Sequence, residues 1–452
     1  MNATIARIAY YAAQRWRGEP VDAVLRELEA SQRWPAERLR ELQWRRATRL
    51  VRHAYETAPF HRRRLEAAGF SPDDLRSWSD WANLPVLDKS DVQEHAEEMR
   101  SSAAPRGLVA ATSGSSGTPV AVDRGHLSWA HAHANVFRAW RWWGVDCGER
   151  HANFGGVPLD PAYAAVAARK DRFFNRVRCS AFTLGPATAR AFHERLLGDS
   201  TRFALGYPSA VTQFADELRA GGLDGRALRW KVVITTAEVL REAQRERISA
   251  TFGCPVVDSY GCAEIGVAGF EHPEGGMRVP VESVVVDYER TAEGAWAVLL
   301  TDLHNLRMPI LRYRVGDLVE PATTPGDGGT WTAPAGGGCA LPLLGTLAGR
   351  AGDTLVLPDG RRVNANQPSY IFKAHGREGR VREYQFVQFP AGRIELRIVT
   401  GPAWHDDWRS RLAEEVRQVL GVAVEVHVVP RLERRGRGKH RDFVRAEDLG
   451  EA

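Results

Sequence analysis

The sequence predicts an α/β protein with a large N-terminal domain, residues 1–349, and a small C-terminal α+β domain, residues 350–452. Helical spacing of apolar residues dominates residues 1–105, and short apolar runs alternate with helical patterns over residues 200–300. A separate α+β pattern then follows residue 350. Alternation of strands and helices is typical of a parallel sheet with crossover helices. We therefore expect mixed β-sheets with crossover helices in the large domain and a small sheet with one helix in the other.

The composition is that of an ordinary soluble enzyme. Of the 452 residues, 44% are hydrophobic and 26% are charged, which excludes disordered, collagen-like and disulfide-rich chains. The five cysteines are widely spaced and odd in number, so we expect reduced thiols and a cytoplasmic protein. No apolar run approaches the roughly 20 residues of a membrane helix, and arginines interrupt the first apolar stretch. We expect neither a membrane segment nor a signal peptide.

Positive charge is carried almost entirely by arginine. The chain has 61 Lys+Arg against 56 Asp+Glu, and only five positions are lysine. Basic residues cluster over residues 431–441, and such a tail could bind nucleic acid. The cluster contains no interleaved aromatic residues and no recognised nucleic-acid motif. We therefore expect no nucleic-acid partner.

The first elements follow from apolar spacing and helix start signals. Val21–Ser31 and Ala36–Glu56 show helical spacing after a proline, and each is expected to form a helix. Two short β-like runs, Leu108–Ala111 and Pro119–Val122, flank a loop of Gly, Ser and Thr. Trp129–Trp143 has the pattern of a helix rich in aromatic side chains.

Residues 200–300 hold the alternating pattern of the large sheet. The expected order is strand Arg202–Leu205, helix Ala210–Ala220, strand Lys231–Thr235, helix Arg241–Thr251 and strand Pro255–Ser259. Met277–Val286 and Trp296–Asp302 are expected to form longer, antiparallel strands.

The small domain follows a Gly- and Pro-rich loop over residues 321–338, with the boundary near Asp353. Its expected elements are strands Thr354–Leu357, Tyr384–Gln388, Arg393–Val399 and Val422–Val429, with one helix, Ala403–Leu420.

The loop Thr112–Thr118 is the first segment that could carry chemistry. Its glycines free the backbone to curl, and its hydroxyls and N–H groups could wrap polyphosphate oxygens. Taken alone, a polar hairpin loop explains it better. No Walker loop, no Gly-x-Ser-x-Gly elbow and no Rossmann glycine motif occurs in the chain, which weighs against P-loop, hydrolase and dehydrogenase functions.

A second segment, Asp258–Glu264, directly follows an expected strand. Open α/β sheets bind ligands at the carboxyl ends of their strands. Tyr260 offers a flat face for a base, and Glu264 offers a hard oxygen ligand for Mg²⁺. A turn with a solvated glutamate is an equally good explanation without further context.

Three further segments are weak signals on their own. Asp317, at the end of Arg312–Asp317, could accept hydrogen bonds from two ribose hydroxyls, or could simply end a strand. Gly349–Asp353 could be a plain interdomain turn. Lys439 follows a glycine near the end of the chain, where a flexible cation could neutralise phosphate charge or could belong to a solvated tail.

Together and in this order, these segments resemble the adenylate-forming superfamily of acyl- and aryl-CoA ligases, peptide-synthetase adenylation domains and luciferases. Phe173–Arg176, Ser180–Phe182 and the Gly-Tyr-Pro-Ser of Leu205–Ala210 resemble the phenylacetate–CoA ligase and CapK-like branch. The resemblance runs from about residue 40 to the end. It implies that a carboxylate attacks the α-phosphate of Mg·ATP, giving an acyl-adenylate and pyrophosphate, and that a thiol of CoA or an acyl carrier protein then takes the acyl group. The small domain would rotate about a hinge between the two steps.

The resemblance also implies roles for individual residues. The β- and γ-phosphates would be held by Ser113, Ser115, Ser116 and Thr118. The other residues of this phosphate-binding loop are Thr112, Gly114 and Gly117. Ala237 and Glu238 would line the adenine, and Tyr260, between Ser259 and Gly261, would stack on it. Glu264 would hold Mg²⁺, Asp317 and Arg350 would contact the ribose, Asp353 would be the hinge, and Lys439 would bridge the carboxylate and the α-phosphate.

Two departures from the family pattern affect the prediction. Ala263 stands where the family usually has Thr, and losing that donor could cost about 1–3 kcal/mol unless Cys262 or a backbone N–H compensates. Relatives in this branch carry a Cys/His zinc site. Residues 270–278 lack the expected Cys and second His, and downstream only Cys339 remains, so we predict no zinc.

The acid-binding pocket is expected to be aromatic and to suit a small, flat or aryl acid. Its candidate walls are Phe137, Trp140, Phe154, Phe182, Tyr207 and Pro208; for any one aromatic ring, a place in the core is the simpler explanation.

Alternatives to a thiol ligase are an adenylating enzyme with an amine acceptor, one that activates an oxyanion such as nitrite, and a non-catalytic adenylate-binding protein. The oligomeric state, a homodimer included, stays open.

Overall fold

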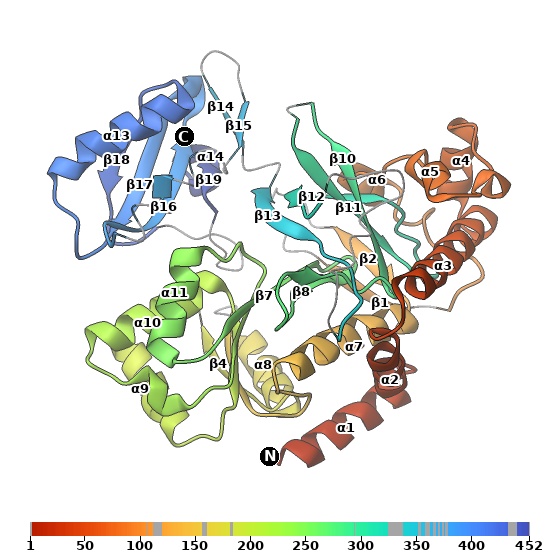
Figure 1. Ribbon diagram of the computed structural model, residues 1–452, viewed down its shortest axis with the longest axis horizontal. Helices are drawn as coiled ribbons and strands as arrows, with labels where there is room; N and C mark the ends of the chain where they lie inside the picture. Colours follow the sequence, from red (N-terminus) through yellow and green to blue (C-terminus); the bar gives the residue numbers. More distant parts are fainter. Residues whose placement is uncertain are drawn as a thin grey trace.

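Figure 1 shows a computed structural model of the chain. The structure describes all residues except 1, 106, 112–119, 156–160, 181–183, 293, 324–337, 351–353, 358–361, 365–367, 369–370, 373–374, 376–377, 433–440 and 452. Among the helices of the described part, none has both the length and the apolar character that crossing a membrane would require.

The N-terminal part is helical, as predicted. Helix α2 coincides with the predicted Val21–Ser31, and α3 extends one residue beyond the prediction, over Ala36–Thr57. Each buries one face, as apolar residues at helical spacing require. The other elements of this part are α1 (Ala3–Trp16), α4 (Pro59–Ala67), η1 (Pro72–Asp74), α5 (Trp78–Ala82), α6 (Lys89–Glu94) and the antiparallel hairpin β1 (Leu108–Ala111) and β2 (Ala121–Arg124).

The centre of the large domain is a seven-stranded sheet in the order β4-β3-β5-β6-β7-β8-β9. The strands from β4 to β7 are parallel, which confirms the crossover pattern predicted over residues 200–300, and β8 and β9 are antiparallel. The strands are β3 (His151–Gly155), β4 (Arg176–Ser180), β5 (Phe203–Gly206), β6 (Val233–Thr236), β7 (Val256–Cys262), β8 (Gly266–Glu271) and β9 (Met277–Arg278).

Helices cover both faces of this sheet. Val233 of β6 faces a core formed with α9, α10 and α11, whereas Ile234 faces a second core formed with α1, α2 and α7. This alternation explains why the parallel strands are apolar along their length. The helices are α7 (His126–Trp142), α8 (Pro161–Phe173), α9 (Pro186–Leu197), α10 (Pro208–Ala220), η2 (Gly225–Leu228) and α11 (Glu242–Phe252).

The predicted single strand Met277–Val286 is wrong. It is two strands in two different sheets, because a turn interrupts it: Pro280 has no N–H for a ladder, and its carbonyl accepts from Ser283 N at 2.8 Å. After this turn the chain enters an antiparallel sheet in the order β10-β11-β12-β13. Its strands are β10 (Val284–Arg290), β11 (Trp296–Asp302, as predicted), β12 (Tyr313–Pro321) and β13 (Gly345–Arg350).

The small domain pairs a four-stranded sheet, β18-β17-β16-β19, with α13. Helix α13 begins at Asp407 rather than at the predicted Ala403, because residues 401–405 form turns in which Trp404 N bonds to Gly401 O. The remaining elements are β14 (Thr354–Val356), β15 (Arg362–Asn364), β16 (Val381–Gln388), η3 (Pro390–Gly392), β17 (Ile394–Thr400), β18 (Glu425–Val428), β19 (Phe443–Arg445) and α14 (Ala446–Leu449).

Candidate active site

Two of the predicted site residues meet between the two sheets of the large domain. The Tyr260 hydroxyl, on β7, donates to Asp317 Oδ2, on β12, at 2.9 Å. Asp317 lies just after a bulge in β12, where Gly316 has a φ of +81° and the pairing with β11 shifts. Bulges re-aim side chains at the edges of sites. Asp317 therefore accepts from Tyr260 although the two residues are 57 positions apart in the sequence.

The predicted ribose partner of Asp317 lies on the next strand. Arg350, the last residue of β13, is the backbone pairing partner of Asp317. The register therefore brings these two residues side by side. Contact of either one with a ribose stays a prediction.

Glu264, four residues after Tyr260, is only 8% exposed. Its Oε1 accepts a hydrogen bond from the Tyr313 hydroxyl at 3.3 Å. In the described part of the chain, no arginine, lysine or histidine forms an ion pair with this carboxylate. A buried anionic oxygen with a neutral donor and no paired cation fits a hard cation such as Mg²⁺. Sequence reasoning missed Tyr313, although it lies inside the selected segment 312–317.

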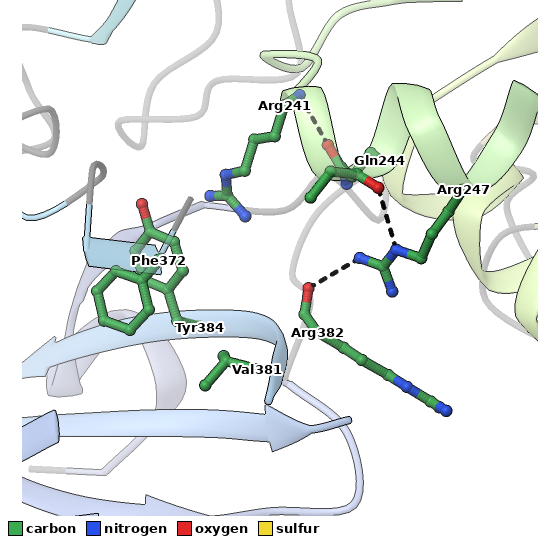
Figure 2. Close-up of a pocket in the computed structure, with 8 residues that line it drawn as sticks. Arg241, Gln244, Arg247, Phe372, Val381, Arg382 and Tyr384 are labelled. Atoms are coloured by element: carbon green, nitrogen blue, oxygen red, sulfur yellow. Dashed lines mark hydrogen bonds between the residues drawn. The ribbon is translucent and has the colours of Figure 1, made fainter. Parts of the chain in front are cut away.

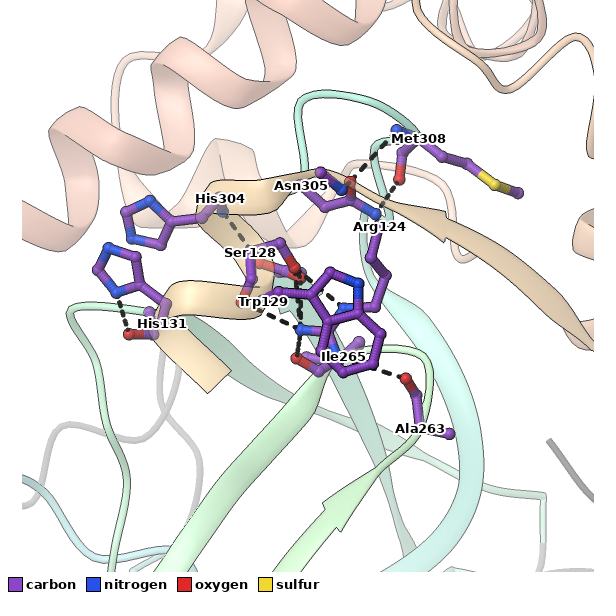
Figure 3. A network of polar contacts seen from close by, with 12 residues as sticks. Arg124, Ser128, Trp129, His131, Ala263, Ile265, His304, Asn305 and Met308 are labelled. Atoms are coloured by element: carbon purple, nitrogen blue, oxygen red, sulfur yellow. Dashed lines mark hydrogen bonds and ion pairs between the residues drawn. The ribbon is translucent and has the colours of Figure 1, made fainter. Parts of the chain in front are cut away.

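The backbone around Glu264 is held by Arg124, a buried arginine at the end of β2 (Figure 3). Its Nη2 donates to Ile265 O at 2.7 Å and its Nη1 donates to Ala263 O at 3.4 Å. Arg124 is therefore hydrogen-bonded to the backbone on both sides of Glu264. Its own charge is balanced by Asp302 at 3.5 Å, and its side chain bonds to Ser128 Oγ. No sequence signal marked Arg124, because a lone arginine after a short strand has no motif.

Close backbone packing explains a glycine in the Tyr260 segment. A Cβ at Gly261 would lie 2.1 Å from Gly266 O on the neighbouring strand β8. Only glycine permits this approach. Ala263, the departure from the family pattern, is exposed on the same turn, and Cys262 is half-buried beside it.

The segment predicted to line the adenine is tied to the Gly-Tyr-Pro-Ser loop. Ala237 follows β6 in a left-handed conformation, with a φ of 70°. The carboxylate of Glu238 accepts from Ser209 N at 3.1 Å and from Ser209 Oγ at 3.0 Å, at the start of α10. A carboxylate is favourable at this position because the helix N-terminus presents unpaired N–H groups. Two loops at the carboxyl ends of neighbouring parallel strands are thereby joined.

A buried carboxyl lies beneath these loops. Asp258 on β7 accepts a hydrogen bond from Thr235 Oγ1 at 2.8 Å, and burial is the main cause that raises the pKa of Asp258 to about 7. The nearby charge of Glu271 raises it further, although Glu271 is itself paired with Arg245. Asp258 is therefore protonated in a large fraction of molecules at neutral pH. In the sequence, Asp258 is marked only as the first residue of the segment Asp258–Glu264.

Three of the proposed pocket walls lie in the hydrophobic cores. The Phe137 ring lies 5.3 Å from that of Tyr10, and Trp140 lies 4.9 Å from Phe203. Phe154 is 1% exposed and packs against core rings on the other face of the sheet. These contacts give the three rings a packing role. Tyr207 and Pro208 lie at the start of α10, beside the Glu238 contact, and a pocket role for any of these residues stays a prediction.

Several predicted residues lie outside the described part of the chain. These are the phosphate loop (Thr112, Ser113, Gly114, Ser115, Ser116, Gly117 and Thr118), Phe182, the hinge Asp353 and the lysine Lys439. Their roles stay predictions, as does the domain boundary near residue 350.

Comparison with known proteins gives relatives over most of the chain. No family model matches it. The phenylacetate-coenzyme A ligase of Aromatoleum evansii is 25% identical over 435 residues, which cover 89% of this chain and 92% of that protein. Protein CapK of Staphylococcus aureus is 21% identical over 241 residues, covering 52% of this chain and 53% of CapK.

The fold is similar to that of a 2-hydroxyisobutyryl-CoA ligase whose structure is known in more than one state. In the postadenylation state, in complex with R3-HIB-AMP, the TM-score is 0.72 at 21% identity, with 92% of each chain covered. In the thioesterification state, in complex with 2-HIB-AMP and CoA, it is 0.58 at 22% identity, with 93% of each chain covered. The TM-score is thus higher against the postadenylation structure than against the thioesterification structure.

Proposed function

Because this chain belongs to the adenylate-forming superfamily, in its phenylacetate–CoA ligase-like branch, we propose that it is an ATP-dependent, AMP-forming acid–CoA ligase. It activates a small carboxylic acid as an acyl-adenylate, releases pyrophosphate and transfers the acyl group to the thiol of CoA. The observation that carries this proposal within the chain is the hydrogen bond of Tyr260 to Asp317 between the two sheets. Close to Tyr260 in the sequence, Glu264 accepts a hydrogen bond from Tyr313, and Arg124 holds the backbone on both sides of Glu264.

The nucleotide-binding roles follow from the chemistry of these side chains. Asp317 offers carboxylate oxygens to ribose hydroxyls, and its bond from the Tyr260 hydroxyl fixes both side chains relative to each other. Tyr260 presents an aromatic ring near the carboxyl end of the parallel strand β7, which is the place where open sheets bind nucleotides. Glu264 would hold Mg²⁺, which would neutralise charge on the phosphates.

The first step joins two anions, so positioning and charge neutralisation dominate its catalysis. A carboxylate oxygen of the acid attacks the α-phosphorus of ATP, and the bond from that phosphorus to the bridging oxygen breaks, so that pyrophosphate leaves with the electron pair. We assign charge neutralisation at the α-phosphate to Lys439. In the second step the CoA thiolate attacks the acyl carbon, and AMP leaves as its phosphate oxygen takes back the electron pair.

The class of acid is the finer part of the proposal. The similarity to phenylacetate–CoA ligases over most of both chains supports an aryl acid. A small aliphatic hydroxy acid is the second candidate, because the fold is close to that of a 2-hydroxyisobutyryl-CoA ligase. An acyl carrier protein in place of CoA, an amine acceptor and an oxyanion substrate such as nitrite are further alternatives.

Acid-dependent ATP–pyrophosphate exchange tests the first half-reaction. The panel contains phenylacetate, benzoates, 2-hydroxyisobutyrate, amino acids, short-chain acids and nitrite, and each active acid is then tested for CoA-dependent release of AMP. We expect exchange with an aryl acid and a CoA thioester as product. Exchange without CoA-dependent release would point to another acceptor. If ATP binds but no acid supports exchange, the ligase assignment fails and a non-catalytic adenylate-binding protein is favoured.

A further inference from the structure

The small domain contacts the large one through an ion pair. Arg241, at the start of α11 in the large domain, is paired with Asp442, just before β19 in the small domain. Both side chains are about four-fifths buried, with exposures of 19% and 21%. Partial burial strengthens a charge-assisted bond relative to a fully exposed pair.

Asp442 is held firmly within the small domain. Its second carboxylate oxygen accepts from the Tyr384 hydroxyl at 3.1 Å, and its backbone carbonyl accepts from Phe386 N at 2.7 Å. The Arg241 guanidinium lies over the Tyr384 ring, 4.4 Å from its centre. One arginine of the large domain therefore makes both an ion pair and a cation–π contact with the small domain.

A second arginine of α11 reinforces the contact (Figure 2). Arg247 Nη2 donates to the backbone carbonyl of Arg382 at 3.3 Å, and its Nη1 donates to Asp216 of the large domain at 3.2 Å. Between the two arginines is a small pocket whose small-domain wall includes Phe372, Val381 and Tyr384. The contact thus combines two arginines of one helix with an apolar patch and two oxygen acceptors of the other domain.

We propose that Arg241 and Asp442 are positioning residues, a latch that stabilises the domain orientation used for adenylation and must open before acyl transfer to CoA. This rests on the proposed function, in which the small domain turns between the half-reactions. The chain in which the pair is formed has a TM-score of 0.72 with the postadenylation structure and of 0.58 with the thioesterification structure of the neighbour. A contact made in one orientation only shifts the equilibrium toward that orientation. Asp442 also follows Lys439 by three residues, so the latch fixes the chain immediately after the segment that carries the proposed catalytic lysine.

Two variants break the latch from opposite sides, Arg241→Met and Asp442→Asn. Arg417→Met is the matched control, because Arg417 pairs with Glu414 on α13, within the small domain. The domain orientation is measured in the enzyme without ligands by fluorescence energy transfer between maleimide dyes on Ala220→Cys of α10 and Ser410→Cys of α13, both exposed positions. The native cysteines are buried or half-buried. We expect one dominant distance in the wild type and in the control, and a second population in each latch variant, with the ratio of populations changed about tenfold.

The kinetic test separates the two half-reactions. We expect acid-dependent ATP–pyrophosphate exchange to fall about tenfold in both latch variants, while transfer from added acyl-adenylate to CoA is unchanged or faster. The double variant should be no slower than either single variant, because both remove the same contact. Unchanged distances, or equal losses in both half-reactions, would overturn the proposal. If no acid supports exchange in the wild type, the proposed function fails, whereas the distance measurement still decides whether the latch exists.

Discussion

Arg124 is the buried cation that fixes the backbone on both sides of Glu264, and its replacement by methionine isolates that role. The side chain is 2% exposed and donates to Ile265 O, Ala263 O and Ser128 Oγ, while Asp302 balances its charge. Methionine has a similar volume but offers no donor and no charge. The variant therefore leaves the Asp302 carboxylate buried without its cation.

Removing one partner of a buried ion pair costs about 3–5 kcal/mol, because the remaining charge stays desolvated. Burial already raises the pKa of Asp302 while Arg124 lowers it, so the variant should raise this pKa further. We expect Arg124→Met to lower the free energy of unfolding by about 3–5 kcal/mol while Asp302 is ionised, and by less as the pH falls and Asp302 takes up a proton. Adding Asp302→Asn should recover part of the loss, because it removes the uncompensated charge.

Urea unfolding monitored by tryptophan fluorescence measures these values, and calorimetric titration with Mg·ATP measures binding by the folded fraction. We expect weaker Mg·ATP binding in Arg124→Met and in the double variant, since neither holds the Glu264 turn. A free energy of unfolding for Arg124→Met within about 1 kcal/mol of the wild type, or a double variant as unstable as the single one, would refute this prediction.

The remaining predictions concern acidity, backbone packing and the reacting groups. Burial lowers the pKa of five deeply buried histidines and of the half-buried His272. For each of the five, the unfolded chain below its pKa of about 6.5 binds protons that the folded chain does not, and this costs about 2 kcal/mol of stability by pH 5. Buried Asp258, Asp287 and Asp302, whose pKa values are raised, act in the opposite sense; being fewer, they offset only part of this loss. A series of urea titrations from pH 7 to 5 should therefore detect a net loss of stability, and a flat profile would contradict the burial of the histidines. Gly261→Ala should lower the unfolding free energy by more than about 2 kcal/mol, whereas Gly185→Ala, which meets open space, should change it by less than about 1 kcal/mol. Tyr260→Phe removes the hydrogen bond to Asp317 and should lower the unfolding free energy by about 1 kcal/mol. It should also raise the KM for ATP several-fold with little change in kcat, and an unchanged KM would show that Tyr260 does not contact the nucleotide. Lys439→Ala should abolish pyrophosphate exchange while ATP still binds, and full exchange in this variant would remove the lysine from the mechanism. The five deeply buried histidines of the first of these predictions are His61, His131, His133, His151 and His304.

The local elements of this protein could be read from its sequence, because apolar spacing is a short-range property. The helix Val21–Ser31 and the strand Trp296–Asp302 match the structure at both ends. The same reasoning failed for Met277–Val286, where the apolar residues continue through a turn, so that one apolar run serves two sheets. The motifs also predicted the superfamily. Each motif contains residue types suited to one chemical role, and the order of the motifs along the chain can be read directly from the sequence.

Only the tertiary structure decided how the site is held together. Tyr260 meets Asp317 across two different sheets, at a bulge in β12, and Glu238 reaches Ser209 because their strands are neighbours in the sheet. Arg124 supports the Glu264 turn from a hairpin about 140 positions earlier, and no local pattern encodes that distance. The pairing of Arg241 with Asp442 depends in addition on how the two domains are oriented. Such contacts are set by the path of the whole chain, which periodicity and motif spacing do not specify.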